Sequence, residues 1–203
     1  KLQAFPSIDI VHISLGGNDV NFGWAGAADK EAFLDATREH LRAVIEHCLS
    51  VRPDVKVALV GYEYLNISEG FEFNEFGVVT GYDNNVLIAY YVFGLSLPLT
   101  LQEVLANQAY VNNAFIGLEA RKRGLCLEMD RVRYVHSFGL MQAVFGIPIL
   151  GVAPTFPDGV PDGESANYAN FPAGNRNLFS PKDAMDAPSG DIDPIHLLSL
   201  IHI

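Results

Sequence analysis

The sequence predicts an α/β protein built around a parallel β-sheet. Residues 8–15 are apolar and rich in β-branched side chains, which is typical of a strand buried on both faces of such a sheet. Residues 29–51 carry apolar side chains at three- and four-residue spacing, which indicates an amphipathic helix, and residues 55–60 are again apolar. A strand, a helix and a second strand in this order form the crossover unit of a parallel, doubly wound sheet.

The composition is that of a globular protein and disfavours several classes of partner. The chain has 203 residues, 49% hydrophobic and 18% charged, which suffices for one domain with a sizeable core. The formal net charge of −11 disfavours nucleic acid and anionic membranes as partners. No apolar run approaches the roughly 18 residues of a membrane-spanning helix. Cys48 and Cys126 match no zinc-site spacing, so we expect two buried free thiols and neither metal nor cofactor. The sequence predicts neither a compartment nor an oligomeric state.

The first predicted strand ends in Gly16-Gly17-Asn18-Asp19. Two glycines let the backbone turn tightly and approach a ligand closely. In open α/β sheets ligands bind just beyond the carboxyl ends of the strands, so Asn18 and Asp19 are candidate site residues. We expect residues 20–28 to form a loop, in which Trp24 either lines a pocket or packs the loop onto the protein.

The middle of the chain alternates between clear and unclear patterns. Asp29 is a plausible cap for the helix over residues 29–51, and Pro53 follows its end. Residues 62–99 are irregular, acidic and aromatic, which favours either a wall or lid over the site or ordinary surface packing. Within them, residues 86–97 suit a helix or a strand equally well.

The next helix has clearer boundary signals. Thr100 and Glu103 form a capping-box pattern, and Gly124 is the expected stop. The basic residues 121–123 before that glycine suit the negative end of a helix. A third strand is predicted over residues 132–136. His136 and Ser137 follow one another there, so they point to opposite faces and are not expected to pair directly.

Near the other end of the sequence stands Asp193-Pro194-Ile195-His196. Together, Gly16-x-Asn18-Asp19 and Asp193-x-x-His196 resemble the third and fifth sequence blocks of the SGNH (GDSL-type) serine hydrolases. The resemblance implies a three-layer α/β/α, flavodoxin-like fold and the hydrolysis of a small-molecule ester by a Ser-His-Asp mechanism. In that mechanism His196 is the general base, Asp193 orients it, and Asn18 donates to the oxyanion. Gly16 and Asp19 would shape the turn.

The nucleophile of that family lies in a Gly-Asp-Ser block that, like a second block carrying a glycine, precedes the Gly-x-Asn-Asp block. Neither block is found in this sequence. We therefore expect residues 1–203 to be a single domain that is truncated at both ends, lacks its first strands and is inactive, or nearly so, alone. The strand over residues 8–15 would then expose an edge. Residues 197–203 resemble translated adaptor sequence, and we expect them to be a non-native tail.

Two other functions are consistent with an α/β fold. A nucleotide-binding domain would require a glycine-rich phosphate loop, and neither Gly-x-Gly-x-x-Gly nor a Walker motif is present. A non-catalytic carbohydrate- or ligand-binding module would use the aromatic-rich residues 62–82 as its binding surface. Ester turnover by the parent protein distinguishes the hydrolase from this module.

Overall fold

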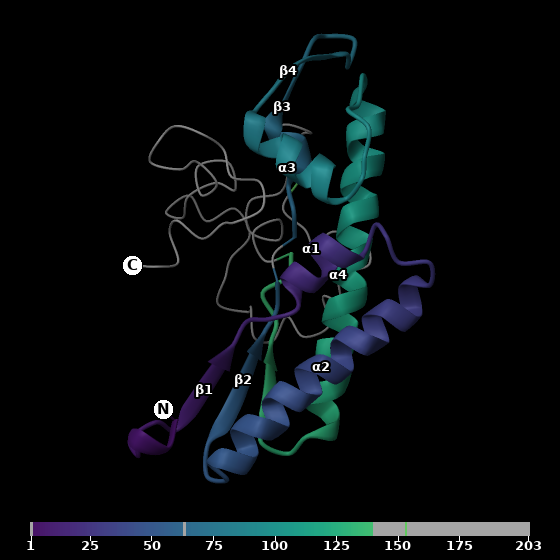
Figure 1. Ribbon diagram of the computed structural model, residues 1–203. Helices are drawn as coiled ribbons and strands as arrows, with labels where there is room; N and C mark the ends of the chain where they lie inside the picture. The colour runs from purple at the N-terminus through teal and green to yellow at the C-terminus, as the bar shows by residue number, and fades with distance from the viewer. Residues whose placement is uncertain (1, 63, 140–152, 154–203) are drawn as a thin grey trace. The chain divides into compact units, whose positions relative to one another are not determined.

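The computed structural model describes residues 2–62, 64–139 and 153 (Figure 1). The chain divides into two compact units, of which the first contains Lys1–Tyr62 and Ala114–Ser137 and the second Glu63–Asn113 and Phe138–Ile203. Helix α4 (Leu101–Glu128) contributes its first half to the second unit and its second half to the first. The prediction of one domain over residues 1–203 stays a prediction.

The first unit contains a three-stranded parallel sheet with the order β1-β2-β5. Its strands are β1 (Ile10–Ile13), β2 (Lys56–Val60) and β5 (Val132–Val135), and the chain from β1 to β2 passes through α1 (Gly17–Gly23) and α2 (Lys30–Val51). A short 3₁₀ helix, η1 (Leu2–Ala4), precedes β1. The parallel pairing of β1 with β2 and of β2 with β5 confirms the predicted α/β class and crossover unit (Figure 1).

The core of the first unit lies between the sheet and its helices. Its buried apolar side chains are Ile13, Val20, Trp24, Leu34, Leu41, Ile45, Val55, Val57, Leu59, Ala114, Phe115, Leu118, Leu125, Cys126 and Val132. β1 differs from the expected fully buried strand, because Ile10 is 62% exposed. Among the described strands β1 pairs with β2 alone, so it forms one edge of this sheet.

Helix α2 forms where its pattern predicted it. The Asp29 carboxylate accepts a hydrogen bond from the backbone N–H of Ala32 at 3.0 Å, which confirms the predicted cap. Leu41 and Ile45 are buried as expected, but Val44 is 40% exposed. The apolar face is therefore narrower than the sequence spacing predicted.

The predicted loop over residues 20–28 is wrong in its first part, because Gly17–Gly23 forms helix α1. Gly17, Asn18, Asp19 and Gly23 are poor helix formers, so local propensity does not favour this helix. Burial does favour it, since Val20 is wholly buried and Trp24, directly after the helix, is also buried. Tertiary packing therefore outweighs propensity here.

The predicted stop at Gly124 is also wrong, because α4 continues to Glu128. Leu125 is wholly buried, and its burial favours continuation of the helix beyond the glycine. The basic residues before Gly124 consequently lie inside the helix. Arg121 forms ion pairs with Glu31 and Asp35 of α2, and these replace the predicted interaction with the helix end.

Within the described residues, the second unit contains a β-hairpin and three helical segments. Its elements are η2 (Ile67–Gly70), β3 (Phe71–Phe73), β4 (Val79–Tyr82), α3 (Asn84–Val92) and the first half of α4. β3 and β4 are antiparallel, and α3 shows that the ambiguous residues 86–97 begin as a helix. At the start of α4, Glu103 N–H donates to Thr100 Oγ1 at 3.3 Å and Thr100 N–H donates to Glu103 Oε2 at 3.2 Å. This reciprocal pair confirms the predicted capping box.

Side-chain amides of α4 hold the segment that leads into the hairpin. Asn112 accepts from the Leu65 N–H at 2.8 Å and donates to the Leu65 carbonyl at 2.8 Å. Gln108 accepts from the Ser68 N–H at 2.7 Å. The irregular segment therefore has structure of its own. No helix within the described part of the chain is long and apolar enough to cross a membrane.

Candidate active site at the carboxyl edge of the sheet

The turn that follows β1 requires glycine at its first position. Gly16 has a φ of 96°, in the left-handed region that side chains other than glycine rarely adopt. A Cβ atom at Gly16 would also lie 3.2 Å from a methyl group of Leu118. The Gly16 carbonyl accepts the Val20 N–H at 3.2 Å, so the turn leads directly into α1.

Asn18 and Asp19 lie in the first turn of α1, and both side chains are exposed. They are accessible to a ligand at the carboxyl edge of the sheet, where the sequence predicted them. In the described structure the Asp19 carboxylate accepts no backbone N–H, so its predicted role in shaping the turn stays a prediction. Its negative charge lies in the helix's first turn, where the peptide dipoles favour it.

Tyr62, directly beyond the carboxyl end of β2, packs against this turn. A Cβ atom on Gly17 would lie only 2.1 Å from Cε2 of Tyr62, so the Gly17 backbone lies against the phenol ring. The same ring stacks on Phe115 of α4, with centroids 4.9 Å apart and an interplanar angle of 12°. The backbone N–H of Tyr62 donates to Oε1 of Glu119 at 2.9 Å. The ends of β1 and β2 are therefore linked through one aromatic side chain.

Glu119 and Lys122 form a buried ion pair beneath this edge of the sheet. Lys122 Nζ lies 2.9 Å from Glu119 Oε1, and their side chains are 0% and 6% exposed. Lys122 also donates to the Val60 carbonyl at 3.2 Å, and the Tyr134 hydroxyl donates to Glu119 Oε2 at 2.5 Å. A buried ion pair is tolerated when further hydrogen bonds satisfy its polar atoms, as these do.

His136 and Ser137 follow β5 and have different partners, as their adjacent positions predicted. Nδ1 of His136 lies 3.5 Å from the Tyr134 hydroxyl, whereas the Ser137 hydroxyl donates to the Gly61 carbonyl at 3.1 Å. Gly61 has no room for a side chain, because its Cβ would lie 2.8 Å from Glu119 Oε2. The carboxyl ends of β2 and β5 are therefore tightly packed around Gly61.

The structure brings together only some of the predicted site residues. Gly16, Asn18 and Asp19 lie in one turn at the carboxyl edge, as expected. Asp193 and His196 lie outside the described residues, as does the predicted tail over residues 197–203. Their roles stay predictions.

The aromatic residues near the turn have different environments. Trp24 is buried and meets Phe33 of α2 edge to face, with ring centroids 6.4 Å apart. It therefore packs this segment onto the protein, which was one of the two predicted roles. Phe22 is 77% exposed, so it is the large aromatic side chain of this segment that a ligand could reach.

Sequence reasoning missed Tyr62, Glu119 and Lys122. Tyr62 carried a usable signal, since it follows a predicted strand and so belongs to the same carboxyl edge as Asn18. The i, i+3 spacing of Glu119 and Lys122 is common on exposed helix faces and did not indicate burial.

Cys126 is not suited to act as a nucleophile. Burial raises the pKa of its thiol to about 11, so the reactive thiolate form is scarce at neutral pH. Both cysteines are free, as predicted, but Cys48 is only half-buried. The described residues hold no cluster of three or more His, Cys, Asp or Glu side chains that could bind a metal ion.

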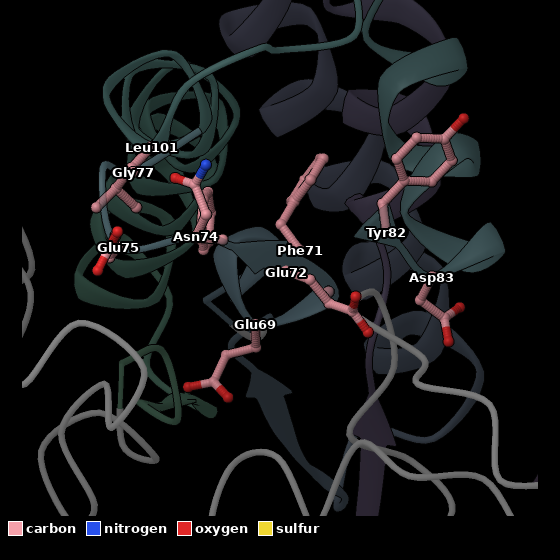
Figure 2. A pocket seen from close by; sticks show the side chains of 11 residues that line it. Glu69, Phe71, Glu72, Asn74, Glu75, Gly77, Tyr82, Asp83 and Leu101 are labelled. Atoms are coloured by element: carbon pink, nitrogen blue, oxygen red, sulfur yellow. The ribbon is translucent and has the colours of Figure 1, made fainter. Parts of the chain in front are cut away.

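A separate cavity of about 740 Å³ lies within the second unit (Figure 2). Residues of η2, the hairpin and the start of α4 line it: Glu69, Gly70, Phe71, Glu72, Phe73, Asn74, Glu75, Gly77, Tyr82, Asp83 and Leu101. Figure 2 shows the carboxylates of Glu72 and Asp83 on the same side of the hairpin. Every charged side chain in this lining is acidic, which disfavours an anionic ligand.

No protein-family model, curated protein or solved structure matches this chain. The residue pattern and the geometry of the sheet edge therefore carry the functional proposal.

Proposed function

We propose that this chain supplies part of the active site of an ester hydrolase of the SGNH type, with the flavodoxin-like fold of that family. One observation carries the proposal. The Gly16-x-Asn18-Asp19 pattern begins three residues after a strand of a parallel sheet and enters helix α1, and the Asn18 side chain is exposed there. Ligands of open α/β sheets bind at such an edge.

Each proposed residue has one chemical role. A serine hydroxyl attacks the ester carbonyl carbon, while His196 takes the hydroxyl proton and returns it to the leaving alcohol. Asp193 holds the imidazole in the required orientation. Asn18 donates its side-chain amide to the oxygen that becomes negative in the tetrahedral intermediate. Water then hydrolyses the acyl-serine.

The serine belongs to a Gly-Asp-Ser block, which we propose lies in the parent protein before Lys1. The experiment therefore uses the protein encoded by the reading frame extended upstream, beside residues 1–203 alone. Both are incubated with a fluorophosphonate, which labels activated serines, and with p-nitrophenyl acetate. We expect labelling and turnover only in the extended protein.

Variants assign the roles. Asn18→Ala should lower kcat by about 10²–10³, as the loss of one oxyanion donor does in other hydrolases. His196→Ala should abolish labelling. Asn113→Ala removes an exposed asparagine of α4 and serves as the matched control, with wild-type turnover expected. An extended protein that forms no adduct and hydrolyses no ester contradicts the proposal. An adduct on a serine within residues 1–203 alone contradicts the placement of the nucleophile.

The cavity of the second unit favours a second candidate, a non-catalytic module that binds a carbohydrate or another small ligand. Its volume is in the range of small-molecule sites, and it lies in the aromatic-rich segment that the sequence predicted for this role. Calorimetric titration with neutral oligosaccharides tests it. Glu72→Gln should weaken binding, whereas Glu46→Gln on the exposed surface of α2 should not. Absence of binding by the wild-type chain contradicts this candidate.

A further inference from the structure

We infer that Tyr62 is a positioning residue for Asn18. The buried pair of Glu119 and Lys122 holds Tyr62 in place from α4. The catalytic consequence rests on the proposed oxyanion role of Asn18, whereas the positioning itself rests only on contacts within the first unit.

The first step is the contact between Tyr62 and the turn. Gly17 is buried, and the 2.1 Å separation that its Cβ would have from the phenol ring leaves no space between ring and backbone. Asn18 follows Gly17 by one peptide unit, so their Cα atoms lie about 3.8 Å apart. A displacement of the ring therefore shifts the backbone from which the Asn18 side chain extends.

The second step is what holds the ring. Phe115 is wholly buried and stacks on Tyr62 nearly parallel, with a centroid separation of 4.9 Å. Lys122 Nζ lies 6.0 Å from the centroid of the same ring, at the limit of a cation–π contact. Both residues belong to α4, so the ring takes its position from one long helix.

The third step is what holds the backbone. Glu119 accepts the N–H of Tyr62, and Lys122 donates to the carbonyl of Val60 two residues earlier. The ion pair thus hydrogen-bonds to the main chain on both sides of Gly61, the first residue after β2. An apolar pair of similar volume would often stabilise a fold as well or better. The hydrogen bonds of this ion pair locate the end of the strand, which apolar side chains do not do.

The test compares Tyr62→Phe, which keeps the ring, with Tyr62→Leu, which removes it. Tyr110→Leu, on the exposed face of α4, is the matched control. The first readout is the pattern of ¹⁵N-edited NOE contacts of the Asn18 side-chain amide in the 203-residue chain, because loss of the ring current alone would shift nearby resonances. We expect Tyr62→Leu to change these contacts, and Tyr62→Phe and the control to keep the wild-type pattern.

The second readout is ester hydrolysis by the extended protein. A donor misplaced by about 1 Å can lower a rate by about 10²-fold, so we expect Tyr62→Leu to lower kcat at least tenfold with little change in KM. Tyr62→Phe keeps the ring, so its kcat should stay near the wild-type value. A general loss of folding would instead reduce the amount of active enzyme, which active-site titration with the fluorophosphonate measures.

Gly17→Ala by itself covers the case in which Tyr62→Leu does not fold. The added methyl group meets the ring and should change the NOE contacts of the Asn18 side-chain amide, and the smaller leucine in Gly17→Ala/Tyr62→Leu should reverse part of that change. Unchanged contacts in Gly17→Ala, or in a folded Tyr62→Leu, overturn the positioning inference. If the contacts change while the wild-type extended protein hydrolyses no ester, the proposed function fails and the positioning stands.

Discussion

Replacing Lys122 by methionine tests the energetic role of the buried ion pair. Methionine has a similar length but no charge, so the Glu119 carboxylate would remain buried without its cationic partner. Removing one member of a buried pair typically costs 3–5 kcal/mol. Two donors to Glu119 remain, the Tyr62 N–H and the Tyr134 hydroxyl, so we expect the lower end of this range, about 3 kcal/mol.

Urea denaturation followed by circular dichroism measures this loss. For a slope of about 1–3 kcal/mol per molar urea, a loss of about 3 kcal/mol lowers the midpoint by about 1–3 M. Arg121→Met, one position earlier in α4, removes only partly exposed ion pairs with Glu31 and Asp35 and should cost about 1 kcal/mol or less.

A double replacement separates a buried charge from a lost contact. Glu119→Leu/Lys122→Met removes both charges, so it should recover most of the stability lost in Lys122→Met. It also serves as the folded reference if Lys122→Met does not fold. A Lys122→Met midpoint equal to that of Arg121→Met, or a double variant less stable than the single one, would refute the reasoning.

Three further predictions concern other parts of the first unit. Gly16→Ala should lower the free energy of unfolding by about 1–3 kcal/mol, because its φ of 96° strains any other residue; an unchanged urea midpoint would contradict this. The guanidinium of Arg52 hydrogen-bonds to Asp54 and lowers the pKa of that carboxyl to about 2. The stabilisation that the Arg52–Asp54 pair gives the folded state is therefore present above the ordinary pKa of an aspartate, and it is lost as the pH falls toward 2. An NMR titration should find the low midpoint in the wild type and an ordinary one in Arg52→Met. Iodoacetamide at pH 8 should alkylate Cys48 and spare Cys126, whose pKa is raised to about 11 by burial; mass spectrometry of equal labelling at both sites would count against the buried thiol.

Much of the fold follows from local patterns. The cap at Asp29 and the capping box of Thr100 and Glu103 were predictable because each depends on residues no more than three positions apart. The parallel crossover was predictable because helix and strand periods are read within short windows. The location of Asn18 on the carboxyl side of the sheet was predictable because it follows the first strand closely in the sequence, and the structure places it in the first turn of α1 with its side chain exposed.

Tertiary structure decided the features that depend on distant residues. Helix α1 forms from poor helix formers because Val20 is buried in the unit's core. α4 passes through Gly124 for the same kind of reason, since Leu125 beyond it is buried.

The contacts among Tyr62, Glu119 and Lys122 are the clearest case of a feature that depends on distant residues. Lys122 resembles its partly exposed basic neighbours in sequence, and only the packing of α4 against the end of β2 makes it a buried ion-pair partner. Tyr62 lies 45 positions after Gly17 and 53 before Phe115, so no local pattern joins the three. The sequence by itself determined the glycine turn after the first strand and predicted it as a candidate ligand site, whereas long-range packing decided which side chains hold that turn in position. The physical reason is that propensity and periodicity are local, and burial is a property of the whole folded chain.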